Sequence, residues 1–265
     1  MLSGDGTEIG YWTSGDGPPL VLVHGTPADH TRWSPLLPYL ESHATVHAMD
    51  RRGCGASGDG PAYDVAREYE DLATVVDAVA AASGSTVDVY GHSMGAFIAF
   101  HSAALTSSIR RLALYEGWPP TSPEVFAYPP GFGERLDALL ADGNREALLE
   151  TYFRELLKMS DEEFNAFRAQ PSWQGRVAAA HTITRSDRAF SHSRFDPELA
   201  AEITQPTLLV TGGDSTVDFR GDIEGVAAAL PDARIAVIDG QQHVGDVLVP
   251  EIFADVLLAF LGHER

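Results

Sequence analysis

Short apolar runs alternate with amphipathic stretches through the first half of the chain. The runs are rich in valine and leucine, and each ends at a loop that carries Gly or Asp. Apolar runs separated by stretches of helical spacing indicate parallel β–α–β units with buried strands. We therefore predict strands over residues 20–23, 45–49, 86–90 and 112–115, and helices over 67–82 and 96–105.

The pattern changes at Trp118. Five prolines lie within residues 119–130, and helical segments without a strand pattern follow, over 134–140, 145–158, 161–168 and 174–181. The α/β alternation then returns with strands over 207–211 and 234–238 and helices over 223–230 and 251–261. We predict a single α/β domain, residues 1–265, in which a helical cap of about 118–195 interrupts a core of 1–117 and 196–265. Ligands of parallel sheets bind beyond the carboxyl ends of the strands, so the functional residues are expected in the loops there.

The pentapeptide Gly91-His92-Ser93-Met94-Gly95 lies between a predicted strand and a predicted apolar helix. It matches Gly-x-Ser-x-Gly, and a strand–turn–helix is the context in which that motif presents a nucleophile. The glycines permit a sharp turn that lifts the serine above the sheet, and the helix directs its amides and dipole toward that serine. An incidental serine in a Gly-rich turn is the alternative. Agreement on both sides of the motif favours Ser93 as a nucleophile.

The loop His24-Gly25-Thr26-Pro27 follows the first predicted strand. Acyl transfer needs two preorganised donors for the oxyanion that develops on the substrate. We predict that the backbone N–H groups of Thr26 and Met94 supply them. His24 is expected to bond to the loop backbone rather than to act as a base.

A general base is expected after the last predicted strand, where residues 239–243 read Asp-Gly-Gln-Gln-His. Nucleophile, acid and histidine follow one another in that order in chains of this architecture. We therefore predict that His243 takes the Ser93 proton and returns it to the leaving group. The neighbouring His92 is expected to have a packing role.

Two carboxylates are candidates for the acid that orients His243. Asp214, in the sequence Gly-Gly-Asp-Ser of residues 212–215, follows a strand and precedes the histidine, although such a sequence also forms an ordinary Asx turn. Glu116 directly follows the strand 112–115, where a solvated carboxylate is the alternative. The residues alone leave the choice between the two open.

Composition narrows the class of partner. The 265 residues carry a net charge of −20, which repels nucleic acids and anionic membranes, and we expect neither as a partner. The first residues lack a basic stretch followed by an apolar one, and no apolar run is long enough to span a membrane, so we expect a cytoplasmic protein. Nothing in the sequence points to a particular oligomeric state.

Cofactor and metal motifs are missing from the sequence. His-Glu-x-x-His, a phosphate loop and Gly-x-Gly-x-x-Gly after a strand do not occur, so we expect no metal, nucleotide or other cofactor. Cys54 is the only cysteine, which excludes an intrachain disulfide and a cysteine zinc site. It lies in the tight loop 50–57, which is expected to be structural rather than to hold a reactive thiol.

Several segments together resemble the α/β-hydrolase superfamily, in its usual order and over nearly the whole chain outside the insertion. They are His24–Pro27, Asp50–Ser57, Gly91–Gly95, Gly212–Asp214 and the loop of His243. The resemblance implies an eight-stranded, mostly parallel sheet, with residues from about Trp118 to Phe195 as a helical cap over the site.

The same resemblance bears on the acid. In most members a Gly-x-x-Asp follows the penultimate strand, whereas Asp214 comes one residue early after Gly212. Tyr115-Glu116 instead resembles members such as the zearalenone lactone hydrolases, whose carboxylate follows the strand after the nucleophile helix. The resemblance thus favours Glu116 and keeps Asp214 as the alternative.

The expected function is that of a serine hydrolase, of carboxylesterase or lactonase type, which cleaves a small ester, lactone or related acyl substrate through an acyl-enzyme on Ser93. Aromatic residues of the cap are expected to favour a small, partly hydrophobic substrate: Trp118, Phe126, Tyr128, Phe132, Tyr152, Phe153 and Trp173. A cofactor-free perhydrolase or haloperoxidase, a C–C hydrolase and a biosynthetic cyclase are alternatives on the same fold. A non-catalytic receptor for a small ligand is a further alternative.

Overall fold

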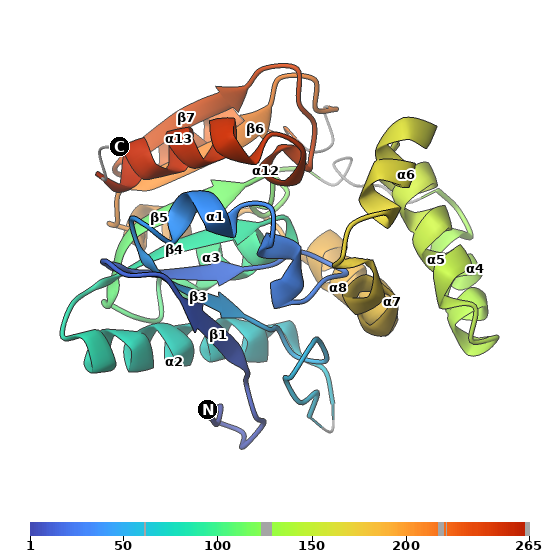
Figure 1. Ribbon diagram of the computed structural model, residues 1–265, viewed down its shortest axis with the longest axis horizontal. Coiled ribbons are helices and arrows are strands. Elements are labelled where there is room, and N and C mark those ends of the chain that lie inside the picture. The colour runs from blue at the N-terminus through green and yellow to red at the C-terminus, as the bar shows by residue number, and fades with distance from the viewer. Residues whose placement is uncertain (61, 123–128, 217–219, 221, 263–265) are drawn as a thin grey trace.

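The predicted strands lie in one seven-stranded sheet (Figure 1). The computed structural model describes residues 1–60, 62–122, 129–216, 220 and 222–262. The strand order is β1-β3-β2-β4-β5-β6-β7, with β1 antiparallel to β3 and all other neighbouring pairs parallel. The strands are β1 Tyr11–Ser14, β2 Pro19–Val23, β3 Thr45–Met49, β4 Val87–His92, β5 Ile109–Tyr115, β6 Thr207–Gly212 and β7 Ala233–Ile238.

The expected count of eight strands is wrong for the described residues, whose sheet has seven. β1 has no counterpart among the predicted strands, because three of its four residues are exposed and it contains no apolar run. The remaining strands match the predicted ranges closely. β2, β4 and β6 are buried along their whole length, which explains why they read as continuous apolar runs.

Helices cover both faces of the sheet. Alternate residues of β2 belong to different apolar cores, Val21 and Val23 to one and Leu20 and Leu22 to the other, because successive side chains of a strand point to opposite faces. The first core includes residues of α2 (Val65–Ser83), α3 (Met94–Ser102), α9 (Pro197–Glu202) and α11 (Ile223–Ala229). The second includes residues of the 3-10 helix His30–Trp33, α1 (Leu37–Leu40) and α13 (Pro250–Leu261).

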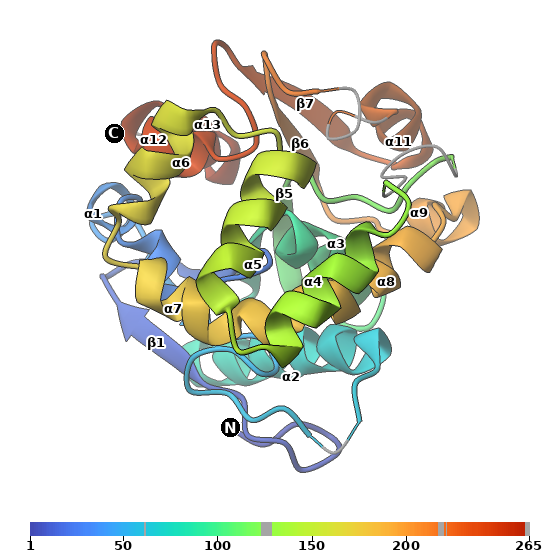
Figure 2. The same cartoon turned by 90° about the vertical axis from the view of Figure 1, so that its right-hand side faces the viewer.

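Between β5 and β6 the described residues form helices and no strand. These are α4 Phe132–Ala141, α5 Arg145–Thr151, a π-helix Tyr152–Leu156, α6 Asp161–Arg168, α7 Trp173–Ala179, a 3-10 helix Ala180–Thr182 and α8 Ile183–His192, followed by α9. Helices α4 to α8 lie together beyond one end of the sheet, on the right in Figure 1 and toward the viewer in Figure 2. α8 was absent from the predicted elements, because most of its residues are polar and only two of them are buried.

The inserted helices have an apolar core of their own. It joins side chains of α4, α5, α6 and α7 to Val244 and Val247, which follow β7 in the chain. The loop of His243 and the inserted helices are therefore packed against each other. The short helix α12 (Gly245–Leu248) lies within this contact.

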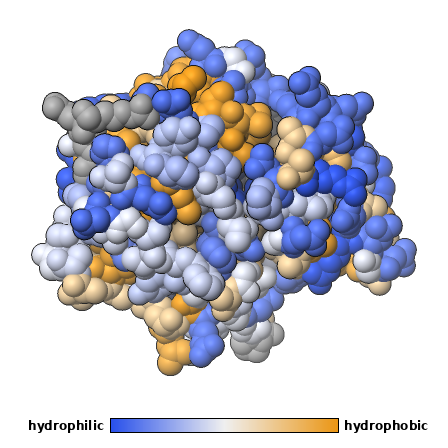
Figure 3. Space-filling view, in the orientation of Figure 1, coloured by the Kyte–Doolittle hydropathy of each residue, from blue (hydrophilic) through white to orange (hydrophobic). Residues whose placement is uncertain are grey.

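Hydrophilic and neutral residues cover most of the face shown in Figure 3, and apolar residues gather toward its upper edge. None of the helices in the described ranges combines the length and the apolar character needed to cross a membrane.

Candidate active site

Ser93 lies at the junction between β4 and α3, in a backbone conformation that is rare for a residue with a side chain. Its φ and ψ are 55° and −126°. The surroundings fix this conformation: Ser93 N–H donates to Tyr115 O at 2.8 Å, and Ser93 O accepts from Ala96 N at 2.8 Å and Phe97 N at 3.0 Å. All other residues of 91–100 are buried, so the strained turn leaves Ser93 as the accessible residue of this segment.

Glycines let neighbouring backbone approach this turn. A methyl group at Gly95 would overlap the carbonyl oxygen of Val23, and one at Gly117 would overlap the carbonyl oxygen of Ser93. A methyl group at Gly25 would lie 2.8 Å from Ser93 Cβ. The loops after β2, β4 and β5 therefore meet around Ser93 at van der Waals contact.

His243 and Glu116 form a buried pair at the same end of the sheet. His243 Nδ1 lies 2.8 Å from Glu116 Oε2, and the two side chains are 7% and 0% exposed. Because an ionised carboxylate only accepts hydrogen bonds, Nδ1 of His243 carries the proton of this contact, and Nε2 is the ring nitrogen that Glu116 does not bind.

Three donors hold the Glu116 carboxylate. Oε1 accepts from Thr211 Oγ1 and from Gly212 N, each at 2.8 Å, in addition to the contact of Oε2 with His243. Glu116 itself has a φ of 46°, so the chain turns sharply where β5 ends. Burial by itself would raise the pKa of Glu116, but the hydrogen bond to His243 and its charge, with the Gly212 N–H, outweigh burial and lower that pKa below its ordinary value.

Asp214, the other predicted acid, lies apart from the histidine ring. Its side chain is exposed, and its backbone N–H donates to Gln241 O at 2.9 Å. Within the described ranges no hydrogen bond joins Asp214 to His243. The segment 212–214 still contributes to the site, through the Gly212 N–H that binds Glu116.

His92 connects the turn of Ser93 to the loop of His243. His92 Nε2 donates to His243 O at 2.7 Å, and the two rings lie 4.7 Å apart. Burial, the charges of Arg32 and Arg176 and the neighbouring His243 lower the pKa of His92 well below its ordinary value, so the ring is neutral. The predicted packing role of His92 thus takes a specific form, a hydrogen bond that holds the loop of His243 beside the turn of Ser93.

Ser93 Oγ and His243 do not form a hydrogen bond in the part of the chain that the structure describes. Catalytic hydrogen bonds are often long or poorly aligned without substrate and shorten in the complex. The side chains of His92 and Tyr115 nevertheless keep the two segments adjacent, because His92 Nε2 donates to His243 O and the Tyr115 hydroxyl donates to Gln242 O.

The predicted oxyanion loop follows β2. The backbone N–H groups of Thr26 and Met94 donate to no other described residue, as an oxyanion site requires. His24 has the predicted structural role: its Nδ1 donates to Gly25 O at 2.8 Å and its Nε2 accepts from Arg51 N at 3.1 Å. Burial lowers the pKa of His24 well below its ordinary value and keeps it neutral.

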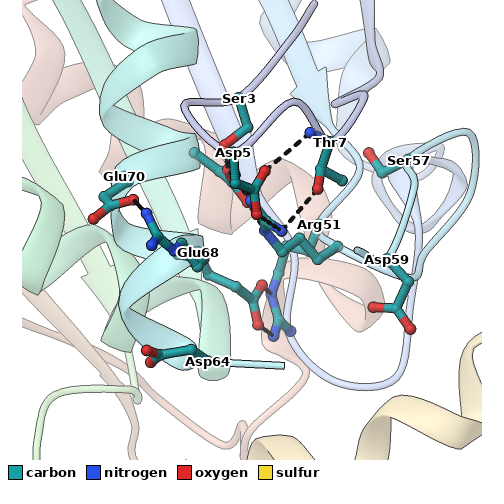
Figure 4. Close-up of polar contacts among 12 residues, drawn as sticks. Ser3, Asp5, Thr7, Arg51, Ser57, Asp59, Asp64, Glu68 and Glu70 are labelled. Carbon is teal, nitrogen blue, oxygen red and sulfur yellow. Dashed lines mark hydrogen bonds and ion pairs between the residues drawn. The ribbon is translucent and has the colours of Figure 1, made fainter. Parts of the chain in front are cut away.

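Paired charges stabilise the loop after β3. Arg51 forms two hydrogen bonds to Glu68, at 2.7 and 2.8 Å (Figure 4). Its Nη1 also donates to Thr26 Oγ1 at 2.7 Å. Arg52 forms a similar buried pair with Asp71. Through Arg51, the predicted oxyanion loop is tied to Glu68 on α2. No signal in the sequence distinguished these pairs from surface charges.

Cys54 lies in the same loop and is buried. Burial raises the pKa of its thiol to about 12, so the thiolate that a reactive cysteine needs does not form near neutral pH. The predicted structural role of this loop agrees with both observations.

The aromatic residues predicted to meet the substrate mostly form the core of the inserted helices. Phe126 and Tyr128 lie outside the described residues. Phe132, Tyr152, Phe153 and Trp173 pack with one another in the inserted core, and Trp118 packs in the core on the α3 side of the sheet. Among residues that the structure describes, no group of three or more His, Cys, Asp or Glu side chains is placed to hold a metal ion.

Comparison with known proteins identifies the family of this chain. The model of the alpha/beta hydrolase family matches residues 20–256. The chain belongs to this family. A crystal structure of an alpha/beta hydrolase from Sphaerobacter thermophilus DSM 20745 has 36% sequence identity and a TM-score of 0.83, over 98% of this chain and 99% of that one.

Other members of the alpha/beta hydrolase family differ in the reaction that their names give. A non-heme haloperoxidase from Rhodococcus erythropolis is 29% identical over 262 residues, 92% of each chain. A pimeloyl-acyl carrier protein methyl ester esterase from Xanthomonas campestris pv. campestris (strain B100) is 28% identical, over 86% of this chain and 89% of that one. These relatives support the assignment of this chain as a hydrolase. Because their named reactions differ, they do not identify its substrate.

Proposed function

We propose that this chain is a serine hydrolase that cleaves a small carboxylic ester, lactone or related acyl compound through an acyl-enzyme on Ser93. The observation that carries the proposal is a serine held at φ 55° on a strand–helix turn, beside a buried His243–Glu116 pair whose Nδ1–Oε2 distance is 2.8 Å. A fold alone does not determine a reaction, whereas this arrangement of groups matches the roles of a nucleophile, a base and an orienting acid.

In the proposed reaction His243 Nε2 accepts the Ser93 proton while Ser93 Oγ attacks the substrate carbonyl carbon. The carbonyl oxygen becomes an oxyanion, to which the N–H groups of Thr26 and Met94 donate. Glu116 remains ionised, holds the Nδ1 proton and stabilises the imidazolium that forms. The imidazolium then protonates the alcohol leaving group, and the acyl group stays on Ser93.

Water completes the cycle. His243 removes a proton from the water, which attacks the acyl carbon, and the second oxyanion collapses to release the carboxylic acid and restore the Ser93 hydroxyl. The esterase name of the Xanthomonas relative supports an ester as the bond that is cleaved.

The test is release of p-nitrophenol from p-nitrophenyl butyrate. We expect a burst that is stoichiometric with enzyme, followed by turnover, and a loss of at least about 1,000-fold in kcat for Ser93→Ala. Ser83→Ala removes the hydroxyl of an exposed serine at the end of α2 and serves as the matched control, with unchanged kcat. Equal rates for Ser93→Ala and the wild type would exclude the proposal.

The haloperoxidase name of the Rhodococcus relative favours a second candidate on the same residues. Acetic acid would acylate Ser93 with loss of water, and hydrogen peroxide would then release peracetic acid and the free serine. Peracetic acid oxidises bromide to hypobromous acid and returns to acetate. Peroxide-dependent bromination of monochlorodimedone in acetate buffer, absent for Ser93→Ala, tests this activity. Bromination that Ser93→Ala retains would exclude it.

A further inference from the structure

Arg176, on α7, is a buried arginine with unused hydrogen-bond donors. It is 4% exposed, its Nη1 donates to Pro27 O at 2.8 Å, and its guanidinium lies 4.0 Å from the centre of the Phe167 ring. Its Nε is buried without a hydrogen-bond partner, and its Nη2 donates to no other described residue. The Nε–Nη2 edge is the edge with which arginine commonly binds a carboxylate through two parallel hydrogen bonds.

The other buried arginines near the site are paired with carboxylates. Arg32 forms two hydrogen bonds to Asp246, and Arg51 and Arg52 form equivalent pairs with Glu68 and Asp71. Burying a charge without such a partner costs free energy. Arg176, which has no such partner among the described residues, therefore points to a ligand that offsets this cost or to a function that requires it.

The carboxylates nearest to Arg176 are used elsewhere. Asp246 binds Arg32 and the Tyr90 hydroxyl, and Asp29 accepts from Thr31. Both attract Arg176 electrostatically, but neither forms an ion pair with it. Burial and the charge of Arg32 lower the pKa of Arg176 to about 9, so the net surroundings disfavour its positive charge and an added anion would relieve that penalty.

Arg176 also lies at the edge of the proposed active site. Pro27, whose carbonyl it binds, directly follows the oxyanion residue Thr26. The positive charge of Arg176 contributes to lowering the pKa values of the buried His24 and His92 rings. One turn earlier on α7, Trp173 has an indole N–H that is buried and has no partner among the described residues. Residues three apart lie on the same face of a helix, so two unused donors face the same side of α7.

We propose that Arg176 binds a carboxylate of the substrate, so that the preferred acyl compounds are anionic, such as monoesters of dicarboxylic acids. This inference rests on the proposed hydrolysis at Ser93 and names its substrate class. Arg176 is a binding residue in this scheme: it fixes one end of the substrate while Ser93 attacks the ester at the other end.

Matched esters test the proposal. Methanol release is measured from monomethyl succinate, glutarate and adipate, and from the neutral methyl butyrate, valerate and hexanoate. We expect the wild type to prefer one of the anionic esters over its neutral counterpart. Arg176→Met should lower kcat/KM for that ester by about 10- to 100-fold, mainly through KM, and should change the neutral esters by less than about threefold.

The control is Arg168→Met, which removes an exposed arginine that pairs with Glu146 on the same group of helices, and it should leave both series unchanged. Arg176→Lys keeps the charge but not the two-pronged edge and should retain part of the preference. It also serves as the test variant if Arg176→Met does not fold. Equal losses on anionic and neutral esters, or no anionic preference in the wild type, would overturn the proposal in favour of a structural tether to Pro27.

Calorimetry separates this inference from the proposed function. Glutarate should bind the wild type and Ser93→Ala equally and should bind Arg176→Met at least about 10-fold more weakly. Hydrolysis that does not depend on Ser93, together with intact glutarate binding, would exclude the serine mechanism and leave the anion site standing. Equal glutarate affinity in the wild type and Arg176→Met would exclude the anion site alone.

Discussion

Glu116 and Asp214 occupy equivalent places in the chain and have different surroundings. Each follows a buried parallel strand, β5 for Glu116 and β6 for Asp214, and these strands are neighbours in the sheet. Glu116 is 3% exposed and its carboxylate receives three hydrogen bonds. Asp214 is exposed and meets the histidine loop through its backbone.

The difference arises from the backbone at the ends of the two strands. At Glu116 the chain turns with a φ of 46°, and Gly117 then passes close to the carbonyl of Ser93. β6 instead directs backbone and hydroxyl donors toward Glu116, from Gly212 and Thr211. The donors that hold the Glu116 carboxylate thus come from β6, the strand that Asp214 follows.

The largest difference between the two positions is expected in catalysis. Glu116→Gln keeps the shape of the side chain but leaves Nδ1 of His243 without its anionic acceptor, so kcat for p-nitrophenyl butyrate should fall by about 1,000- to 10,000-fold. Asp214→Asn should stay within about threefold of the wild type. A loss confined to Asp214→Asn would make Asp214 the acid. Comparable losses in both variants would contradict the assignment of Glu116 alone.

A smaller difference is expected from the glycine beside each carboxylate. A methyl group at Gly117 would overlap the carbonyl oxygen of Ser93, whereas one at Gly213 would lie 3.2 Å from its nearest neighbour, Asp239 Cα. Gly117→Ala should therefore lower the free energy of unfolding by about 2–3 kcal/mol, and Gly213→Ala should change it by less than about 1 kcal/mol.

Urea unfolding followed by fluorescence measures both glycine variants. The m-value serves as the control, because a change in slope would indicate altered denatured or native states rather than a simple change in stability. An unchanged unfolding free energy for Gly117→Ala would contradict the close approach between the loops after β4 and β5.

The smallest effect is expected in the pH dependence of stability. The hydrogen bond and charge of His243 lower the pKa of Glu116 in the folded protein below its ordinary value of 4.5. A depressed folded-state pKa contributes stability above pH 4.5 that is lost as the pH falls through the lowered value. The advantage of the wild type over Glu116→Gln in unfolding free energy should therefore shrink as the pH falls below 4.5. An advantage that grows with acidity would contradict the sign of this shift.

The sequence predicted those parts of the molecule whose structure depends on neighbouring residues in the chain. The core strands follow from the apolar runs. The turn at Ser93 follows from glycines at positions where a methyl group would clash with neighbouring backbone. β1 and α8 escaped prediction because few of their residues are buried. The choice between Glu116 and Asp214 depends on the direction of two backbones that meet only in the folded chain.

The burial of Arg176 is a second feature that the sequence does not predict. An arginine within a predicted helix gives no sign of whether it will be buried, and pairing with a carboxylate is a property of the tertiary contacts. The structure shows three buried arginines with such partners and Arg176 without one in the described residues. No spacing in the sequence could have separated these cases.

The hydroxyl of Ser93 is the group on which the proposed hydrolysis depends. Incubation with a fluorophosphonate probe, followed by digestion and mass spectrometry, reports which side chain is activated as a nucleophile. We expect a single adduct on Ser93, much slower labelling in Glu116→Gln and normal labelling in Asp214→Asn. An unlabelled wild type, or an adduct on another serine, would contradict this expectation.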